Sequence, residues 1–516
     1  MLLRLSSSLL MLSLLGSTAL AQVADIGLRG AQSDGVPQTD DNLNGIDDGE
    51  EFTDAAPANP FSSTLLEEQE QAQAALEAEA ELPLAANARQ PVANTSGNSR
   101  ALAAQRVGVD PANGLPTPLA NRPAQPVQGG GTREDNPFAP IGIRAGTFTL
   151  FPTIEQVVGT TSNADFSEDG EASTFSETRA SVRFVSDWST HRLRGGIGGA
   201  YTAFLNGESE NLPTGAADVE LRLDGANDLA VTFGANYDAR TESAILGDVV
   251  VPAGETLDER PLVQLLSGFA EVSKGGGRFV PTLRGGFERL MYSDATASDG
   301  TPIEQGARDN TLVDATLRLA YEVSPGWQPF AEGSIGTRIY DTDVDTNGQD
   351  RNSLLASLRG GAAFDTGEKL SGELALGYGV EAFDDDALED LGGFTVDGGV
   401  DWSVDRLTTA SFNATTTFAG STDVGESGSI SYAASVGLRR EVRENFSVNA
   451  RILGSLRSYE GTDREDRAFQ AEVGADWALN RTATIFGTVG YEKVESNTEF
   501  NSYDATTARL GLRLSR

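Results

Sequence analysis

The chain is 516 residues long and carries 76 acidic against 38 basic side chains, for a formal net charge of −38, with no cysteine and one histidine. Such acidity argues against binding nucleic-acid phosphates, and the absence of cysteine excludes disulfides and a lipid-modified cysteine. One histidine without cysteine also argues against a transition-metal site and against a paired nucleophile and base, so we do not expect an enzyme.

Residues 1–21 have the features of a secretory signal peptide. Arg4 precedes an apolar run from Leu9 to Leu15, and Ala19-Leu20-Ala21 fits a small-residue cleavage site. The apolar run is too short to cross a bilayer as a helix, and no later stretch of about eighteen apolar residues follows. We therefore expect an exported protein without transmembrane helices.

Residues 22–138 are rich in Pro, Ala, Gln, Asn and Asp and poor in aromatic residues. Such a composition buries too little apolar surface to offset chain entropy, so it predicts a largely disordered, acidic extension. Within it, Thr64 and Glu67 have the spacing of a capping box and open a run of good helix formers. We predict a short helix near residues 64–82.

The same extension contains a calcium-loop spacing with oxygen-bearing side chains at Asp40, Asn42, Asn44, Asp48 and Glu51. Alternating oxygens can converge on one hard cation, and Gly45 would permit the sharp turn. Flanking helices are not expected, which argues against an EF-hand. The alternative interpretation is a solvated acidic linker; apart from calcium, no cofactor is expected.

Residues 139–516 alternate apolar and polar side chains with turn signals at strand-like spacing. In residues 370–380, for example, Leu374, Leu376 and Tyr378 share one face while Glu373 lies on the other. This predicts an all-β fold, a transmembrane antiparallel up-and-down β-barrel of about eighteen strands, with sixteen as the alternative. The predicted strands start near residues 144, 174, 190, 215, 227, 262, 277, 309, 327, 351, 368, 391, 405, 428, 444, 466, 481 and 502.

Short turns and longer acidic loops alternate between these segments, which predicts periplasmic turns and extracellular loops. An even strand number places the N-terminal extension and the C-terminus in the periplasm. The aromatic residues predict two girdles at the membrane interfaces. The girdle residues are Trp188, Trp327, Trp402 and Trp477 beside short turns, and Tyr201, Tyr237, Tyr292, Tyr340, Tyr459 and Tyr491 toward long loops.

Charged residues on the polar strand faces predict a ladder in the lumen. It could steer solutes through a transverse field, or consist of ion pairs that stiffen the wall. The candidates are Arg179, Arg183, Arg192, Arg194, Arg222, Arg284, Arg318, Arg359, Arg451, Arg509, Glu373 and Glu472.

The block Arg144-Ala145-Gly146-Thr147-Phe148-Thr149-Leu150-Phe151-Pro152, followed by Thr161-Ser162-Asn163, resembles the opening strand and first loop of the β-barrel porin type 2 family. This resemblance implies an outer-membrane barrel of alphaproteobacterial type with a disordered N-terminal extension. Some members of that family are linked to exopolysaccharide export. Ser162 departs from the aspartate that the family pattern places there.

Two functions follow as hypotheses. The first is a porin-like channel for passive passage of small polar solutes, with a link to exopolysaccharide export implied by the resemblance. The second is a plugged scaffold barrel that docks periplasmic partners through its N-terminal extension. Expected partners are outer-membrane lipids and lipopolysaccharide, the outer-membrane assembly machinery and periplasmic polysaccharide-export proteins, with no nucleic acid. The expected location is the bacterial outer membrane.

Overall fold

The structure is a computed structural model that describes residues 100–120 and 137–516, except 169, 207–208, 243–256, 368 and 499–500. The predicted signal peptide, the calcium loop and the helix near 64–82 lie outside the described residues. Among the described residues, no helix combines the length and apolarity needed to cross a membrane.

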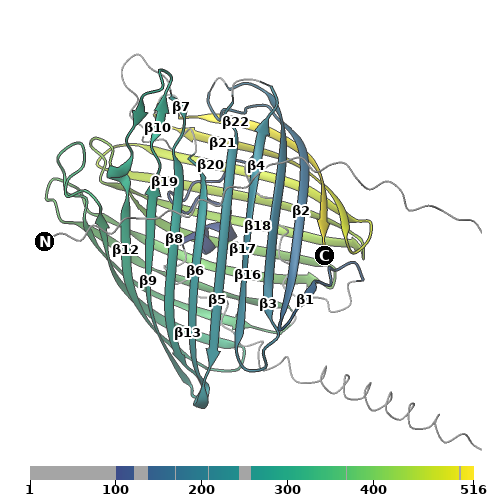
Figure 1. The fold of residues 1–516 in the computed structure, drawn as a ribbon. Helices are drawn as coiled ribbons and strands as arrows, with labels where there is room; N and C mark the ends of the chain where they lie inside the picture. The colour runs from purple at the N-terminus through teal and green to yellow at the C-terminus, as the bar shows by residue number, and fades with distance from the viewer. Residues whose placement is uncertain are drawn as a thin grey trace, which may run out of the picture. The chain divides into compact units, whose positions relative to one another are not determined.

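Eighteen long antiparallel strands form one closed barrel (Figure 1). They are β2 (Phe148–Thr161), β3 (Ser173–Ser186), β4 (Arg192–Phe204), β5 (Leu212–Asp224), β6 (Leu229–Thr241), β8 (Leu262–Lys274), β9 (Phe279–Tyr292), β12 (Asn310–Tyr321), β13 (Trp327–Tyr340), β14 (Ser353–Asp365), β15 (Leu370–Phe383), β16 (Leu391–Asp405), β17 (Thr408–Gly420), β18 (Gly428–Arg443), β19 (Phe446–Glu460), β20 (Glu465–Ala478), β21 (Ala483–Ser496) and β22 (Tyr503–Ser515). Each strand pairs with the next, and β22 pairs back with β2 from Thr153↔Ser515 to Thr161↔Thr507. The predicted eighteen-stranded barrel is confirmed, and every predicted strand start lies within a few residues of an observed one.

The remaining elements are short. β1 (Ile143–Ala145) pairs with the first residues of β2. β7 (Leu257–Glu259), β10 (Ala295–Ala297) and β11 (Pro302–Ile303) form a small sheet in the loops after β6 and β9. The two 3-10 turns are η2 (Ala226–Asp228) and η3 (Gly306–Arg308), and the described helix is α2 (Arg100–Val107).

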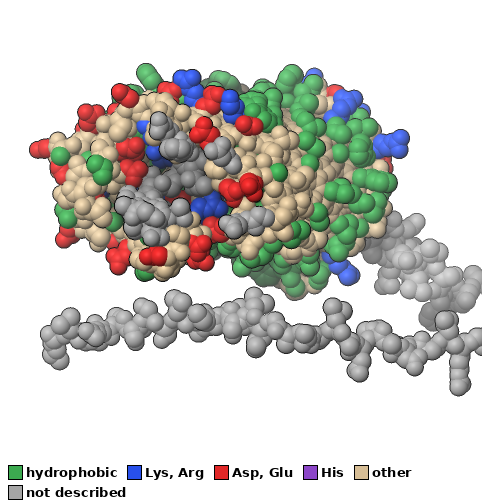
Figure 2. Space-filling view, turned by 90° about the horizontal axis from the view of Figure 1, so that it is seen from above, with side chains coloured by type: hydrophobic (Ala, Val, Ile, Leu, Met, Phe, Trp, Pro, Cys, Tyr) green, Lys and Arg blue, Asp and Glu red, His purple; other side chains and the backbone are tan. Residues whose placement is uncertain are grey.

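The two ends of the barrel differ. Eight short turns connect the strands at the short-turn end, where β2 begins and β22 ends, and nine mostly longer loops connect them at the long-loop end. Hydrophobic side chains cover the outer wall, whereas acidic side chains gather at the long-loop end (Figure 2). On the outer face Leu317, Leu358 and Phe394 are 60%, 69% and 74% exposed to a surrounding medium. Such an alternation, apolar outside and polar inside, suits a wall that faces lipid.

Residues 100–120, the plug segment, lie inside the ring of strands; α2 is purple in Figure 1. After α2 the chain makes a small hairpin in which Asp110 N donates to Leu115 O (2.6 Å) and Thr117 N to Gly108 O (3.3 Å). Gly108 and Gly114 adopt positive φ angles of 89° and 74°, which glycine tolerates without a steric penalty. The predicted disorder of residues 22–138 therefore does not extend to this segment. Its apolar side chains find their partners on the barrel wall, which local composition does not reveal.

Candidate functional site

The plug segment is held in the lumen by hydrogen bonds from wall side chains to its backbone. Arg451 Nη2 of β19 donates to Arg106 O (2.6 Å), and Gln470 Nε2 of β20 donates to Thr117 O (2.9 Å). Glu492 Oε2 of β21 accepts from Leu119 N (2.9 Å). These bonds satisfy backbone groups that would otherwise be buried without partners.

Further contacts involve Gly114 and Asp110. Ser431 Oγ of β18 donates to Gly114 O (3.1 Å), and a Cβ on Gly114 would stand only 2.6 Å from the Cβ of Ser431. On the other side of the lumen, Arg240 Nη2 of β6 pairs with Asp110 Oδ1 at 3.0 Å. Both side chains of this pair are largely buried, at 15% and 9% exposure. The plug segment therefore spans the lumen from β18–β21 to β6.

Apolar contacts complete the seat of the plug segment, in three clusters. Ala104, Val107 and Val109 pack with Ala433 and Leu453. Ala112 packs with Val263, Leu265 and Leu290. Leu115 and Ala120 join a third cluster that includes Phe175, Leu212, Ala468, Val494 and Ala505. Most of these wall residues lie toward the long-loop ends of their strands, so the plug segment fills the long-loop half of the lumen.

The wall from β12 to β16 carries buried ion pairs on its lumen face. Arg318 makes two bonds of 2.7 Å to Glu373, and Arg338 Nε lies 2.7 Å from Glu381 Oε1. Arg359 Nη1 lies 2.9 Å from Asp397 Oδ2. Charges this deeply buried are tolerated only when paired and hydrogen-bonded. These pairs connect strands that lie two or three apart in the wall, so they stiffen this part of it.

A second charged network crosses the seam where the barrel closes. Glu155 of β2 accepts from Arg179 of β3 (2.7 Å) and from Arg513 of β22 (2.5 Å). Arg513 also lies 3.3 Å from Asp476 of β20. The closing strands β2 and β22 pair over a short stretch of backbone, and these side chains connect them to strands on both sides.

All twelve predicted ladder residues lie on lumen-facing strand positions. Arg179, Arg284, Arg318, Arg359 and Glu373 are ion-paired within the wall. Arg451 instead holds the plug segment. Near the short-turn end Arg194 pairs with Glu220 (2.9 Å) and Arg222 with Asp224 (2.9 Å), in a more exposed setting. The remaining ladder positions are Arg183, Arg192, Arg509 and Glu472.

Three of the predicted girdle tyrosines face the wrong way. Tyr292, Tyr340 and Tyr459 point into the barrel: Arg308 Cζ lies 3.8 Å from the Tyr292 ring centroid, Tyr340 is 7% exposed, and the Tyr459 hydroxyl donates to Asp466 (2.7 Å). Nearness to a loop fixes the height of a residue, but the strand register fixes its face, and one step along a strand reverses that face. The outer face does carry Trp188, Trp327, Trp402, Trp477, Tyr201, Tyr237 and Tyr491.

Sequence reasoning also missed several lumen charges, among them Arg240, Glu332, Arg338, Glu381 and Asp397. Arg338 and Glu381 lie close to the long-loop ends of their strands, where the sequence leaves the register undefined. The signal that could have found Arg338 is its even spacing from Glu332 on the same strand, because residues two apart share a face.

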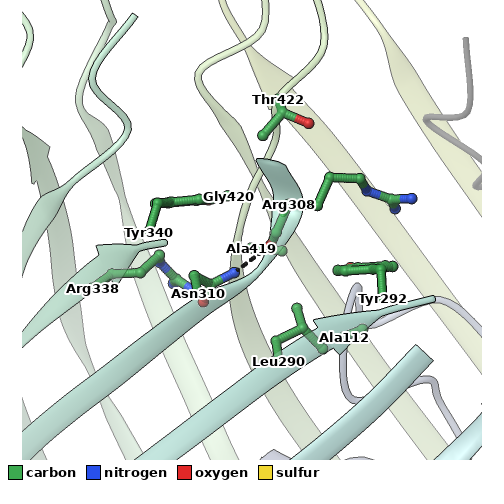
Figure 3. A pocket seen from close by; sticks show the side chains of 10 residues that line it. All are labelled: Ala112, Leu290, Tyr292, Arg308, Asn310, Arg338, Tyr340, Ala419, Gly420 and Thr422. Carbon is green, nitrogen blue, oxygen red and sulfur yellow. Dashed lines mark hydrogen bonds between the residues drawn. The ribbon is translucent and has the colours of Figure 1, made fainter. Parts of the chain in front are cut away.

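A small cavity remains where the plug segment meets the wall (Figure 3). Ala112 of the plug, Tyr292, Asn310 and Tyr340 line it together with Leu290, Arg308, Arg338, Ala419, Gly420 and Thr422. Asn310 Nδ2 donates to Arg308 O (3.0 Å). Arg308 pairs with Glu242 and Arg338 with Glu381, so each cation here is balanced by a carboxylate. We interpret the cavity as the gap between plug and wall.

The loops at the long-loop end are strongly acidic. Together they contain 28 acidic and four basic residues, whereas the short turns carry five and four. Arg351 is 1% exposed on its side chain and joins two of these loops, with Nε 2.8 Å from Asp345 Oδ2 and Nη2 3.3 Å from Asp423 O. Burial opposes ionisation of Asp345, but hydrogen bonds from Gln349 N–H and from Arg351 outweigh it and hold the pKa of its carboxyl below the usual value.

A closed antiparallel barrel with an apolar outer wall and a charged lumen defines an outer-membrane β-barrel of the porin-like channel class. The chain belongs to the family described as "Putative beta-barrel porin 2", whose sequence model matches residues 136–516. The resemblance seen in the sequence is thereby confirmed.

Several solved structures match this chain at low sequence identity. They include OccK2 (OpdF) of Pseudomonas aeruginosa, with 13% identity, a TM-score of 0.38 and coverage of 71% of this chain and 98% of that one. The copper transporter OprC has 9% identity, a TM-score of 0.39 and coverage of 73% and 81%. The siderophore receptor PirA from Acinetobacter baumannii has 7% identity, a TM-score of 0.36 and coverage of 71% and 80%. No curated protein matches the sequence. Identities this low do not extend to the function of this chain.

Proposed function

We propose that this protein is an outer-membrane channel for small polar solutes that its own plug segment closes from within. The observation that carries the proposal is the position of residues 100–120, which cross the lumen and bind opposite walls through Arg240 and Arg451. A lumen lined by charged side chains on eighteen strands is wide enough for water once such a segment leaves it.

The acidic long-loop end supports a preference for cations. Twenty-eight carboxylates against four bases at one mouth create a negative potential that raises the local concentration of cations and lowers that of anions. The expected orientation, with the long loops outside and both barrel ends in the periplasm, would place this potential at the extracellular mouth.

Planar-bilayer recording of the purified full chain tests the proposal. We expect a low open probability for the natural chain, and a larger and more persistent conductance when residues 100–120 are replaced by a Gly-Ser linker of equal length. A matched control replaces loop residues 384–390, most of which are exposed, in the same way and leaves the plug segment in place.

The outcomes separate the channel from the scaffold hypothesis. Absence of conductance in both the natural and the plug-replaced chain would refute the channel. It would favour a scaffold barrel, a function that a closed lumen also supports. Equal conductance in the two chains would instead show that the plug segment does not obstruct the pore.

The link to exopolysaccharide export is part of the proposal only through the family resemblance. It predicts that deleting the gene lowers secreted polysaccharide and that a plug-replaced chain restores secretion. Unchanged secretion would remove the link and leave the channel intact. The proposed periplasmic, lipopolysaccharide and assembly partners can be sought by cross-linking in intact cells.

A further inference from the structure

The wall has one incomplete seam, between β16 and β17. Their backbones pair over seven residue pairs, from Gly398↔Ala414 to Asp405↔Thr408, while every other neighbouring pair of wall strands in the described residues has at least nine. From Asp397 toward the long-loop end, side-chain hydrogen bonds replace the backbone pairs between the two strands. Thr416 Oγ1 accepts from Val396 N (2.8 Å) and donates to Val396 O (3.1 Å), and Thr415 Oγ1 donates to Asp397 Oδ1 (3.0 Å).

Residues 415–432 form the long-loop end of β17 and β18, and we call them the inner hairpin. They lie against the inner face of the wall. A Cβ on Gly379 of β15, a lumen-facing position, would stand 3.1 Å from the Phe418 ring. A Cβ on Gly393 of β16, also lumen-facing, would stand 2.8 Å from the Tyr432 hydroxyl and 3.0 Å from Ile430 Cδ1. Arg338 Nη2, from the lumen face of β13, donates to Phe418 O (3.4 Å).

The sequence of the inner hairpin nevertheless has the pattern of an ordinary wall hairpin. Phe418, Ile430 and Tyr432 continue the faces of β17 and β18 that point outward lower down, where Phe412 and Val436 are 41% and 45% exposed. The intervening positions are small and polar and suit a wet lumen; they include Thr415, Thr417, Ser429 and Ser431. Three large apolar side chains that would face lipid in a complete wall are therefore packed inside the barrel.

The existing register between β16 and β17 is the one that a complete wall would need. Extending Gly398↔Ala414 by one and two steps pairs Asp397 with Thr415 and Val396 with Thr416, the residues that side-chain bonds now join. Further steps would pair Thr395 with Thr417. Since the N–H and C=O of Val396 point toward β17, those of Phe394 do so as well, because an antiparallel ladder alternates. Phe394 thus offers backbone groups at the place that β17 has left.

We infer that the inner hairpin has two positions: the tucked one seen here, and a flush one in which β17 pairs with β16 along its whole length. In the flush position the lumen widens, and Ser431 and Thr417 move away from Gly114 of the plug segment. The inference rests on the proposed channel and deepens it, because it couples widening of the pore to loosening of the plug. New backbone pairs favour the flush position, and the plug contacts favour the tucked one.

Because the chain has no cysteine, disulfides can trap each position in the full-length protein. Thr395→Cys with Thr417→Cys would form a non-hydrogen-bonded cross-strand pair, whose Cα separation of about 4.5 Å suits a disulfide. Gly393→Cys with Ile430→Cys would trap the tucked position. The four single-cysteine variants serve as controls for intermolecular cross-linking.

After mild oxidation in membranes we expect both pairs to cross-link. In the flush-locked protein the amides of residues 104–119 should exchange with deuterium at least tenfold faster than after reduction, and slower in the tucked-locked protein. Cross-linking at 393–430 without any at 395–417 would overturn the two positions. Cross-linking at both pairs without ion conductance in either state would keep the two positions and refute the channel.

A variant without cysteine gives an independent measurement. Gly379→Ala places a methyl group 3.1 Å from the Phe418 ring, so it should favour the flush position and speed exchange in residues 104–119. Gly333→Ala is the control, since its Cβ would meet nothing closer than 3.9 Å. Equal exchange in the two variants would contradict the packing that we infer holds the hairpin inside.

Discussion

Replacing Asp110 should release the plug segment by an amount that the structure allows us to estimate. Its carboxylate pairs with Arg240 at 3.0 Å, and the same Oδ1 accepts from Ala112 N at 2.7 Å. A buried hydrogen bond between charged partners contributes about 2 kcal/mol and a neutral one about 1 kcal/mol. Arg240 keeps a second partner in Asp238, at 3.1 Å, which limits the penalty of leaving it alone.

Asp110→Ala removes both interactions and should cost the closed state about 3 kcal/mol, or roughly 150-fold in the ratio of released to seated plug. Asp110→Asn keeps an acceptor for Ala112 N and loses only the charge, so about tenfold is expected. Hydrogen exchange of residues 104–119 in the full chain, alongside single-channel open probability, measures this ratio. If Asp110→Ala exchanges no faster than the natural chain, the Arg240 pair does not hold the plug, and the reasoning is refuted.

Four further outcomes follow from the same structure. Glu373→Ala should destabilise the barrel to urea by about 3–5 kcal/mol because Arg318 stays buried, while the double change Arg318→Met with Glu373→Leu should come close to the natural stability. Arg351→Ala should raise protease cleavage in loops 341–352 and 421–427 with no change in barrel unfolding. Because its pKa is lowered, ionised Asp345 stabilises these loops at every pH above 3.8, the usual pKa of an aspartate. Cleavage by an acid-active protease should therefore rise only when the pH falls below 3.8. In a KCl gradient, the reversal potential of the plug-replaced chain should show cation selectivity that weakens with rising salt; anion selectivity would contradict the role of the acidic loops.

The wall could be predicted from the sequence because its signal is local. Side chains alternate with a period of two along most strands, and the apolar face must meet lipid, so strands such as β15 and β19 are visible from their residues alone. The four tryptophans lie on the outer face for the same reason, since short turns fix both height and register. Tyr340 and Tyr459 were placed on the wrong face because longer loops leave the register undefined.

The contents of the lumen could not be predicted in that way, because they depend on contacts between distant parts of the chain. Arg451 and Arg106 are 345 residues apart in sequence, and Leu119 and Glu492 are 373 apart. The inner hairpin is a different case. Its sequence favours a place in the wall, and only the packing of Phe418 and Tyr432 against glycines of β15 and β16 reveals the tucked position.

The sequence of the wall nevertheless contains apolar lumen-facing residues that indicate where the plug segment packs. Val263, Leu265, Leu453 and Val494 occupy lumen-facing positions, where a permanently water-filled pore would favour polar side chains. In the run Leu262-Val263-Gln264-Leu265-Leu266 the alternation of β8 fails, and Ala112 of the plug segment packs on the side chains that break it. A lumen that remained empty would expose these side chains to water at a cost of about 1.5–3 kcal/mol each. The breaks in alternation are thus explained by a segment that occupies the lumen for much of the time, and the seat of the plug is encoded in the wall as well as in the plug.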